Sequence, residues 1–145
     1  DAAIEEDYVA PALGWAVTQN LPIVFICEDN DLSVLTKTED RRSWRAVDLA
    51  NSLNMYAVDI TDDPWLIAYH VKKIRESGEP GFINIQTVRG IWHAGTGVDN
   101  DLEWNRYELV EKELSVMGLS KEMTVININN KERIDFIWQK LQQKS

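Results

Sequence analysis

Hydrophobic and polar positions along the first ninety residues follow two alternating patterns. Three short apolar runs are typical of strands buried on both faces, and they cover residues 23–27, 55–60 and 81–88. Apolar residues at helical spacing predict helices over residues 5–19, 43–53 and 65–77. Pro64 at the start of the third helix and Gly78 after its end are typical boundary residues. This alternation predicts an α/β fold, a parallel sheet with helices on both faces and right-handed crossovers.

The pattern becomes charged and amphipathic from Glu103 onward. It predicts one helix that ends at Gly118 and a last helix that carries Ile134, Ile137, Trp138 and Leu141 at helical spacing. The stretch TVININ at 124–129 alternates, so it is either a short strand or the beginning of the last helix. Residues 1–145 are therefore predicted to form a single domain, with 103–145 as a helical C-terminal extension.

Composition and charge narrow the classes of function. The formal net charge is −9, which argues against binding to nucleic acid phosphates. The only locally basic stretch is RRSWR at 41–45, and it is interpreted as a solvated loop. The single cysteine, Cys27, cannot form an internal disulfide and is expected to be a small buried hydrophobe. No apolar run approaches the ~20 residues of a membrane span, so the expected location is cytoplasmic.

The first predicted strand ends in a stretch of oxygen-bearing side chains, EDNDLS. Ligands of open α/β sheets lie outside the carboxyl ends of the strands, and carboxylate and amide oxygens suit magnesium. Asp29, Asn30 and Asp31 are thus either an ordinary acidic turn or part of a magnesium site. Asp1 precedes the first predicted helix, where a diphosphate would be stabilised by free N–H groups. Magnesium would then join Asp1 to Asn30 through that diphosphate.

An Asp followed by small residues, a helix and an apolar strand ending in Asn resembles the thiamine diphosphate motif, GDG followed at a distance by NN. The stretches DAAIEED and LPIVFICEDNDLSVLT are similar to the alpha subunit of 2-oxo acid dehydrogenases, the decarboxylating component. The similarity continues through VDITDDPWLIAYHVKKIRESGEPGFINIQTVRGIWHAGT, so that it covers residues 1 to about 100. The resemblance implies the thiamine diphosphate-binding fold, in its diphosphate-binding half.

The resemblance also implies roles for individual residues. Asp1 and Asn30 would bind magnesium through their side chains and Leu32 through its backbone carbonyl. Ala2 and Ala3 would present backbone groups to the diphosphate.

Two further residues correspond to cofactor-proximal positions of the family. Glu28 precedes the Asn position and would lie near the phosphates. His93 matches the loop histidine that the family holds close to the cofactor and the active-site entrance. Taken alone, a loop histidine is more often a solvated surface residue, but with this resemblance His93 is the candidate catalytic residue for proton transfer near neutral pH. His70 is interpreted as a helix-face residue without a special role.

The chain departs from the family motif at several positions. Ala2 stands where the family usually has Gly, and Asp29 replaces the first Asn of the pair, which adds negative charge beside the diphosphate. The Gly that usually precedes the motif Asp is absent, so the chain resembles a fragment of a longer alpha chain. The resemblance implies a beta-type partner subunit that carries the aminopyrimidine-binding domain, a lipoyl-bearing acyltransferase as a further partner, and a small 2-oxo acid as substrate.

Other functions remain open at this point. A transketolase or an acyloin-forming synthase uses the same cofactor. A glycosyltransferase of another class would use Asp29-x-Asp31 to hold a metal and a nucleotide sugar, although this motif leaves Asp1 and His93 unexplained. A non-catalytic interaction subunit that keeps the fold is compatible with Ala2 and Asp29.

Overall fold

The computed structural model describes residues 2–90 and 104–143. The chain divides into two compact units, residues 1–102 and residues 103–145. The first unit contains the sheet and the second contains two helices.

Three parallel strands form the sheet of the first unit. They are β1 (Val24–Asp29), β4 (Tyr56–Thr61) and β5 (Gly81–Gln86), and β5 lies between the other two. The three predicted strands form, with ends shifted by up to two residues. The prediction that the first strand is buried on both faces is wrong within the described residues, because β1 pairs on one side only and Ile26 is 51% exposed. The register places the last residues of the three strands, Asp29, Gln86 and Thr61, side by side at the carboxyl edge.

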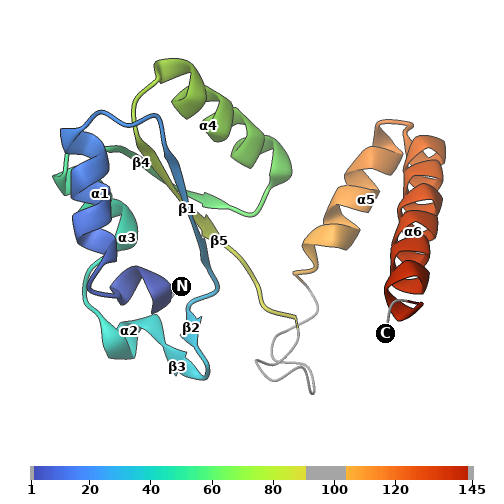
Figure 1. The fold of residues 1–145 in the computed structure, drawn as a ribbon, viewed down its shortest axis with the longest axis horizontal. Helices are drawn as coiled ribbons and strands as arrows, with labels where there is room; N and C mark the ends of the chain where they lie inside the picture. Colours follow the sequence, from blue (N-terminus) through green and yellow to red (C-terminus); the bar gives the residue numbers. More distant parts are fainter. Residues whose placement is uncertain (1, 91–103, 144–145) are drawn as a thin grey trace. The chain divides into compact units, whose positions relative to one another are not determined.

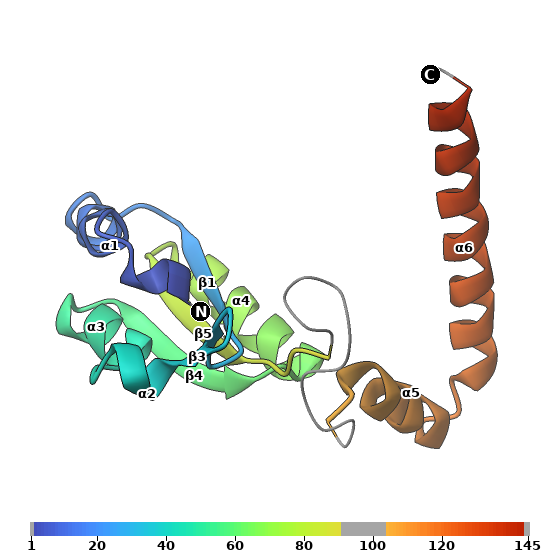
Figure 2. The same ribbon diagram turned by 90° about the horizontal axis from the view of Figure 1, so that it is seen from below.

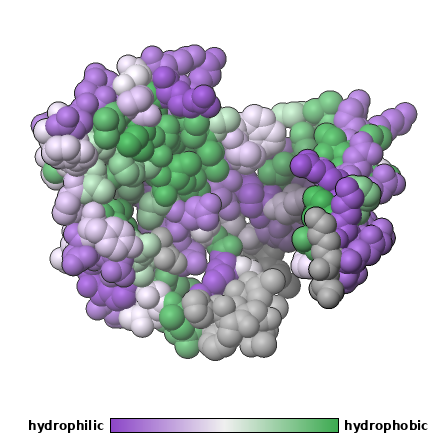
Figure 3. All heavy atoms as spheres, in the orientation of Figure 1, coloured by the Kyte–Doolittle hydropathy of each residue, from purple (hydrophilic) through white to green (hydrophobic). Residues whose placement is uncertain are grey.

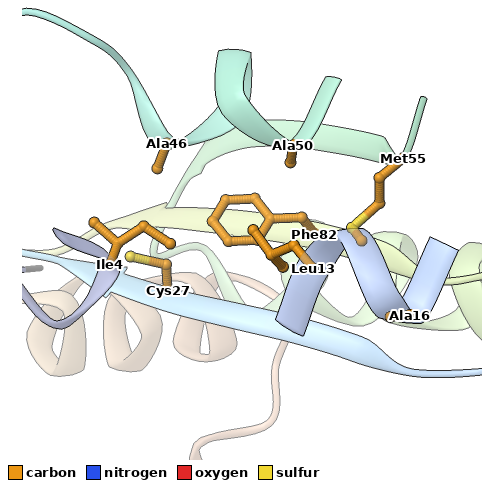
Figure 4. Packing of buried hydrophobic residues seen from close by; sticks show 8 residues of the cluster. All are labelled: Ile4, Leu13, Ala16, Cys27, Ala46, Ala50, Met55 and Phe82. Atoms are coloured by element: carbon orange, nitrogen blue, oxygen red, sulfur yellow. The ribbon is translucent and has the colours of Figure 1, made fainter. Parts of the chain in front are cut away.

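Helices cover both faces of this sheet, as the sequence pattern predicts (Figures 1 and 2). On one face lie η1 (Ala2–Glu5), α1 (Val9–Thr18) and α3 (Ala46–Ser52), and on the other lies α4 (Pro64–Ser77). The first face buries the ring of Phe82 among side chains from these three helices and from β1 (Figure 4). The second face packs Ile83 and Ile85 against Ile74 of α4.

The predicted helix over residues 5–19 is split in the structure. Residues Ala2–Glu5 form a short 3-10 helix, and the α-helix begins only at Val9. Pro11 explains the break, because its ring clashes with the carbonyl four residues earlier and it has no N–H to donate. Starting at Val9 places Pro11 in the first turn, where backbone N–H groups lack helical partners in any case.

The boundaries of α4 follow the predicted signals. The side chain of Asp63 accepts hydrogen bonds from the backbone N–H groups of Trp65 and Leu66, and Pro64 occupies the first helical position. Gly78 ends the helix with a left-handed φ of 70°, a conformation in which a side chain is disfavoured.

Three short elements after β1 are not evident from the apolar pattern. A small hairpin consists of β2 (Leu32–Ser33) and β3 (Thr36–Lys37), and one turn of helix, α2 (Thr38–Arg41), follows it. They are too short for a hydrophobic period to be detectable. They fold the chain after β1 back toward η1 (Figures 1 and 2).

The second unit consists of α5 (Arg106–Val116) and α6 (Ser120–Gln142), joined by a turn with Gly118 at a φ of 78°. The stretch 124–129 lies inside α6, so its reading as the beginning of the last helix is correct and its reading as a strand is wrong. A strand needs a neighbour for its backbone hydrogen bonds, whereas a helix satisfies them internally. No helix within the described residues is long and apolar enough to cross a membrane.

Strand β1 forms one edge of the sheet. Within the described residues β1 pairs only with β5, and Ile23 and Ile26 are exposed nearby. Hydrophobic surface gathers over this part of the molecule, between α1 and α4 (Figure 3). The strand VFICED has no charged residue in its middle and no proline, the two features that commonly keep an edge strand from pairing with another chain. Such an edge favours pairing with another chain.

Candidate functional site at the carboxyl edge of the sheet

A cavity of about 360 Å³ lies at the carboxyl ends of the three strands. Its walls come from the loop after β1, from the region between α2 and α3, and from β4 and β5, and they include Asn30, Asp59 and Asn84. This is the edge at which open α/β sheets bind ligands. The predicted magnesium ligand Asn30 thus lines a cavity at this edge.

Two side-chain-to-backbone hydrogen bonds shape the loop at 29–32. Asp29 Oδ1 accepts from the N–H of Asp31 at 2.9 Å, and Asn30 Oδ1 accepts from the N–H of Leu32 at 3.0 Å. Asp31 has a φ of 62°, a conformation that Asp and Asn tolerate better than most residues. An amide oxygen has two lone pairs, so Asn30 Oδ1 retains one for a cation.

The structure brings the beginning of the chain close to this loop. Ile4 is buried in the core and anchors η1. There is a second cavity, of about 230 Å³, and Ala3 and Glu28 both line it, together with Phe25 and Phe82. Ala2 lies in the same short helix. Two of the predicted positions, Asp1 and His93, lie outside the described residues.

Two arginines that were predicted to lie in a solvated loop are instead ordered and largely buried. The side chain of Arg41 is 15% exposed and that of Arg42 is 4% exposed. Both bind the carboxylate of Glu5, which accepts from Arg41 Nη2 at 2.9 Å and from Arg42 Nε at 3.2 Å. The hydrogen bond from Arg41 is the main cause that lowers the pKa of Glu5 below its usual range, against the opposing effect of burial. Within RRSWR the prediction was wrong for these two residues, whereas Arg45, with 63% of its side chain exposed, fits it.

A second polar network crosses β4, β5 and the start of α3. Asp59 Oδ1 accepts from Asn84 Nδ2 at 3.1 Å and from Gln86 Nε2 at 3.0 Å. Asp59 Oδ2 accepts from Arg45 Nη2 at 2.6 Å. Burial alone would raise the pKa of Asp59, but the hydrogen bonds from Arg45, Asn84 and Gln86 outweigh it and lower the pKa. Asn84 Oδ1 is buried and has no hydrogen-bond partner among the described residues.

Sequence reasoning did not select this network, although a signal for it exists. Asp59, Asn84 and Gln86 are polar residues inside otherwise apolar strands. Asn84 and Gln86 are two positions apart, which puts both side chains on one face of β5. Polar residues on one face of a buried strand are therefore a detectable indication of a site at that edge.

Acid stability tests the Asp59 network. Because the native pKa of Asp59 is lowered, its contribution to stability is fully present above the unfolded pKa of about 3.9 and is lost as the pH falls through the native pKa. We expect Asp59→Asn to cost about 1–3 kcal/mol at pH 7, and less at pH 3. Urea unfolding at both pH values measures this difference. Asp7→Asn, at an exposed position, is the control, and an equal cost at both pH values would contradict the network.

Two other residues with sequence predictions are Cys27 and His70. Cys27 is buried as expected, and burial raises its pKa. His70 faces Tyr56, whose hydroxyl lies 2.9 Å from His70 Nδ1, and burial followed by Lys73 lowers the pKa of His70. This contact lies at α4 and is away from the cavity residues.

Metal-binding groups do not cluster in the described part of the chain, residues 2–90 and 104–143: no three His, Cys, Asp or Glu side chains there converge as a metal site would require. A metal at this edge would depend on Asn30 and on backbone oxygens in addition to carboxylates. Such ligands, with phosphate oxygens completing the shell, are typical of magnesium. The residues present therefore fit a magnesium ion that is held jointly with a phosphate-bearing molecule.

No protein-family model and no curated protein matches this chain. Among solved structures, it is similar to a transketolase from Campylobacter jejuni subsp. jejuni NCTC 11168, with 17% sequence identity and a TM-score of 0.55. The match covers 60% of this chain and 14% of the transketolase chain. The chain thus has a mixed α/β fold with a parallel sheet between helices, similar to part of a transketolase.

Proposed function

We propose that this chain is the diphosphate-binding part of a thiamine diphosphate- and magnesium-dependent enzyme. The observation that carries the proposal is the position of η1 beside the loop at 28–32, at the carboxyl edge of a parallel sheet. These are the two segments that carry the resemblance to the cofactor motif. The transketolase-like fold supports the same class of enzyme, because transketolases use this cofactor.

In this proposal each segment has a distinct task. Asn30 Oδ1 and the carbonyl of Leu32 hold magnesium together with Asp1, and backbone groups of Ala2 and Ala3 face the diphosphate. Glu28 lies near the phosphates. His93 holds or moves a proton close to the reacting carbonyl. The bound cofactor supplies the carbanion chemistry that cleaves a bond next to a carbonyl, and the protein orients it.

The reaction that we propose is decarboxylation of a 2-oxo acid with transfer of the acyl unit, as in pyruvate or branched-chain oxo acid dehydrogenases. A beta-type subunit would carry the aminopyrimidine-binding domain, and a lipoyl-bearing acyltransferase would accept the acyl unit. The resemblance of EDNDLS and of the 88–96 stretch favours this reaction. The similarity to a transketolase favours a second candidate, the transfer of a two-carbon unit between sugars.

The contacts of Asp29 bear on the glycosyltransferase alternative. That function requires the Asp29 carboxylate to bind a metal, but Oδ1 accepts from Asp31 N–H and Oδ2 faces Arg42 Nη2 at 3.5 Å. A cation there would compete with the guanidinium. The thiamine diphosphate proposal needs no metal bond from Asp29.

Calorimetric titration of thiamine diphosphate, with and without magnesium, tests the proposal on the native assembly that contains this chain. We expect binding that requires magnesium and that UDP-glucose does not displace. Release of carbon dioxide from pyruvate or a branched-chain oxo acid would then support the dehydrogenase type, and turnover of xylulose 5-phosphate the transketolase type. Absence of binding would contradict the proposed function and leave the interaction-subunit alternative.

A further inference from the structure

Four charged side chains connect η1 to the loop after β1. They are Glu5, Asp29, Arg41 and Arg42, and we call them the charge clasp. Its centre is Arg42, whose Nε donates to Glu5 Oε1 at 3.2 Å and whose Nη2 donates to Asp29 Oδ2 at 3.5 Å. Arg42 Nη1 also donates to the carbonyl of Trp44 at 2.8 Å, and the guanidinium lies 4.6 Å from the centre of the Trp44 ring. Arg42 therefore has a defined position with partners on three segments.

Burial makes these contacts stronger than ordinary surface ion pairs. The side chains of Glu5, Asp29 and Arg42 are 23%, 15% and 4% exposed. Arg41 adds a second guanidinium on Glu5, with Nε at 3.2 Å from Oε2 and Nη2 at 2.9 Å from Oε1. Two positive and two negative groups thus balance one another. A partly buried charge that loses its partner keeps the cost of burial without compensation.

The clasp joins the two segments between which the proposed cofactor site is divided. Glu5 follows Ala2 and Ala3 in η1, and Asp29 directly precedes Asn30. The residues that Arg42 connects are otherwise distant in sequence, since 24 positions separate Glu5 from Asp29. We propose that Arg42 is a positioning residue that sets the spacing of these two segments and neutralises Asp29 beside the phosphates. This inference rests on the proposed function for its ligand, but the clasp itself does not.

The charge of Asp29 gives Arg42 its second task. An unpaired carboxylate beside Asn30 would repel a diphosphate, and at short range such repulsion is strong in a partly buried site. Arg42 offsets that charge. Removing Arg42 alone should therefore lower the affinity for the cofactor more than removing Arg42 together with the charge of Asp29.

The experiment compares Arg42→Gln, Asp29→Asn and the double variant Asp29→Asn/Arg42→Gln in the native assembly. Magnesium-dependent affinity for thiamine diphosphate is measured by calorimetry. We expect Arg42→Gln to weaken this affinity by about 10- to 100-fold, as is usual when groups supporting a metal ligand are removed. We expect the double variant to recover most of this loss. Arg45→Gln, at an exposed arginine of the same stretch, is the matched control. Equal losses in the single and double variants would overturn the neutralising role.

A second measurement separates the clasp from the cofactor. Hydrogen exchange of residues 2–5 and 28–33 is compared without cofactor in wild type, Arg42→Gln and Arg45→Gln. Faster exchange in both segments of Arg42→Gln, but not of Arg45→Gln, would support the positioning role. This result would stand even if wild type binds no thiamine diphosphate. In that case only the proposed function would fail. Unchanged exchange in both segments would overturn the positioning role. Arg42→Lys, which keeps the charge but loses the planar fork, replaces the glutamine variant in both measurements if that variant does not fold.

Discussion

Replacing Asn30 by alanine is expected to weaken magnesium-dependent binding of thiamine diphosphate by ~100-fold or more, judged from the 10- to 100-fold losses that accompany removal of mere supporting groups. Asn30 would contribute its Oδ1 atom to the metal, and alanine has no oxygen to replace it. The same atom accepts the N–H of Leu32 at 3.0 Å, so the substitution also releases the turn that orients the Leu32 carbonyl. Calorimetric titration with and without magnesium measures the loss.

Two further variants isolate the role of this amide oxygen. Asn30→Asp keeps an oxygen for the metal and for Leu32 N–H, and we expect it to retain most of the magnesium-dependent affinity. Asn51→Ala, at an exposed position of α3, should behave like wild type. An Asn30→Ala protein that binds the cofactor as tightly as wild type would contradict the assignment of Asn30 as a metal ligand.

Replacing Phe82 by alanine is expected to lower the free energy of unfolding of the first unit by about 3–5 kcal/mol. The Phe82 side chain is 2% exposed and packs in the core between β1, α1 and α3 (Figure 4). Ala16, Ala46 and Ala50 of the same cluster have no side-chain atoms beyond Cβ with which to fill the space that the ring leaves. Urea unfolding followed by circular dichroism measures the loss.

Leu35→Ala is the control for Phe82→Ala. Leu35 is 60% exposed, and surface substitutions usually change stability by no more than about 0.5 kcal/mol. Because the chain has two compact units, the transition of the first unit has to be identified with a probe of its own. A loss below about 1 kcal/mol for Phe82→Ala would mean that the ring does not hold this layer together, since such a loss is no larger than that of a single buried methylene.

Much of the fold could be predicted because hydrophobic pattern and backbone geometry are linked locally. The apolar runs at 23–27 and 81–88 become strands, of which β5 is buried, and Pro64 and Gly78 mark the ends of α4. Boundaries were less accurate where two local signals compete. The acidic residues at 5–7 favour a helix start, but Pro11 excludes a continuous helix through them, and the structure begins α1 at Val9.

The candidate site could be predicted in part. The position of Asn30 at the carboxyl edge followed from the strand pattern, and the cavity beside it agrees with the edge rule for parallel sheets. Asp59 interrupts an apolar strand and could have been found in this way, whereas Arg42 could not. Whether an arginine is solvated or buried depends on which segments fold over it, and Glu5 meets Arg42 only because η1 and α2 lie side by side (Figures 1 and 2).

The sequence by itself determined the class of fold, the carboxyl edge as the place of the site, and Asn30 as its candidate ligand, because periodicity and turn chemistry act over a few residues. Only the tertiary structure decided the strand order β1-β5-β4, the pairing of Arg42 with Glu5 and Asp29, and the convergence of Asn84 and Gln86 on Asp59. The physical reason is that burial and electrostatic pairing are properties of groups that meet in space. Residues distant in the chain acquire them only after the sheet has brought their segments together.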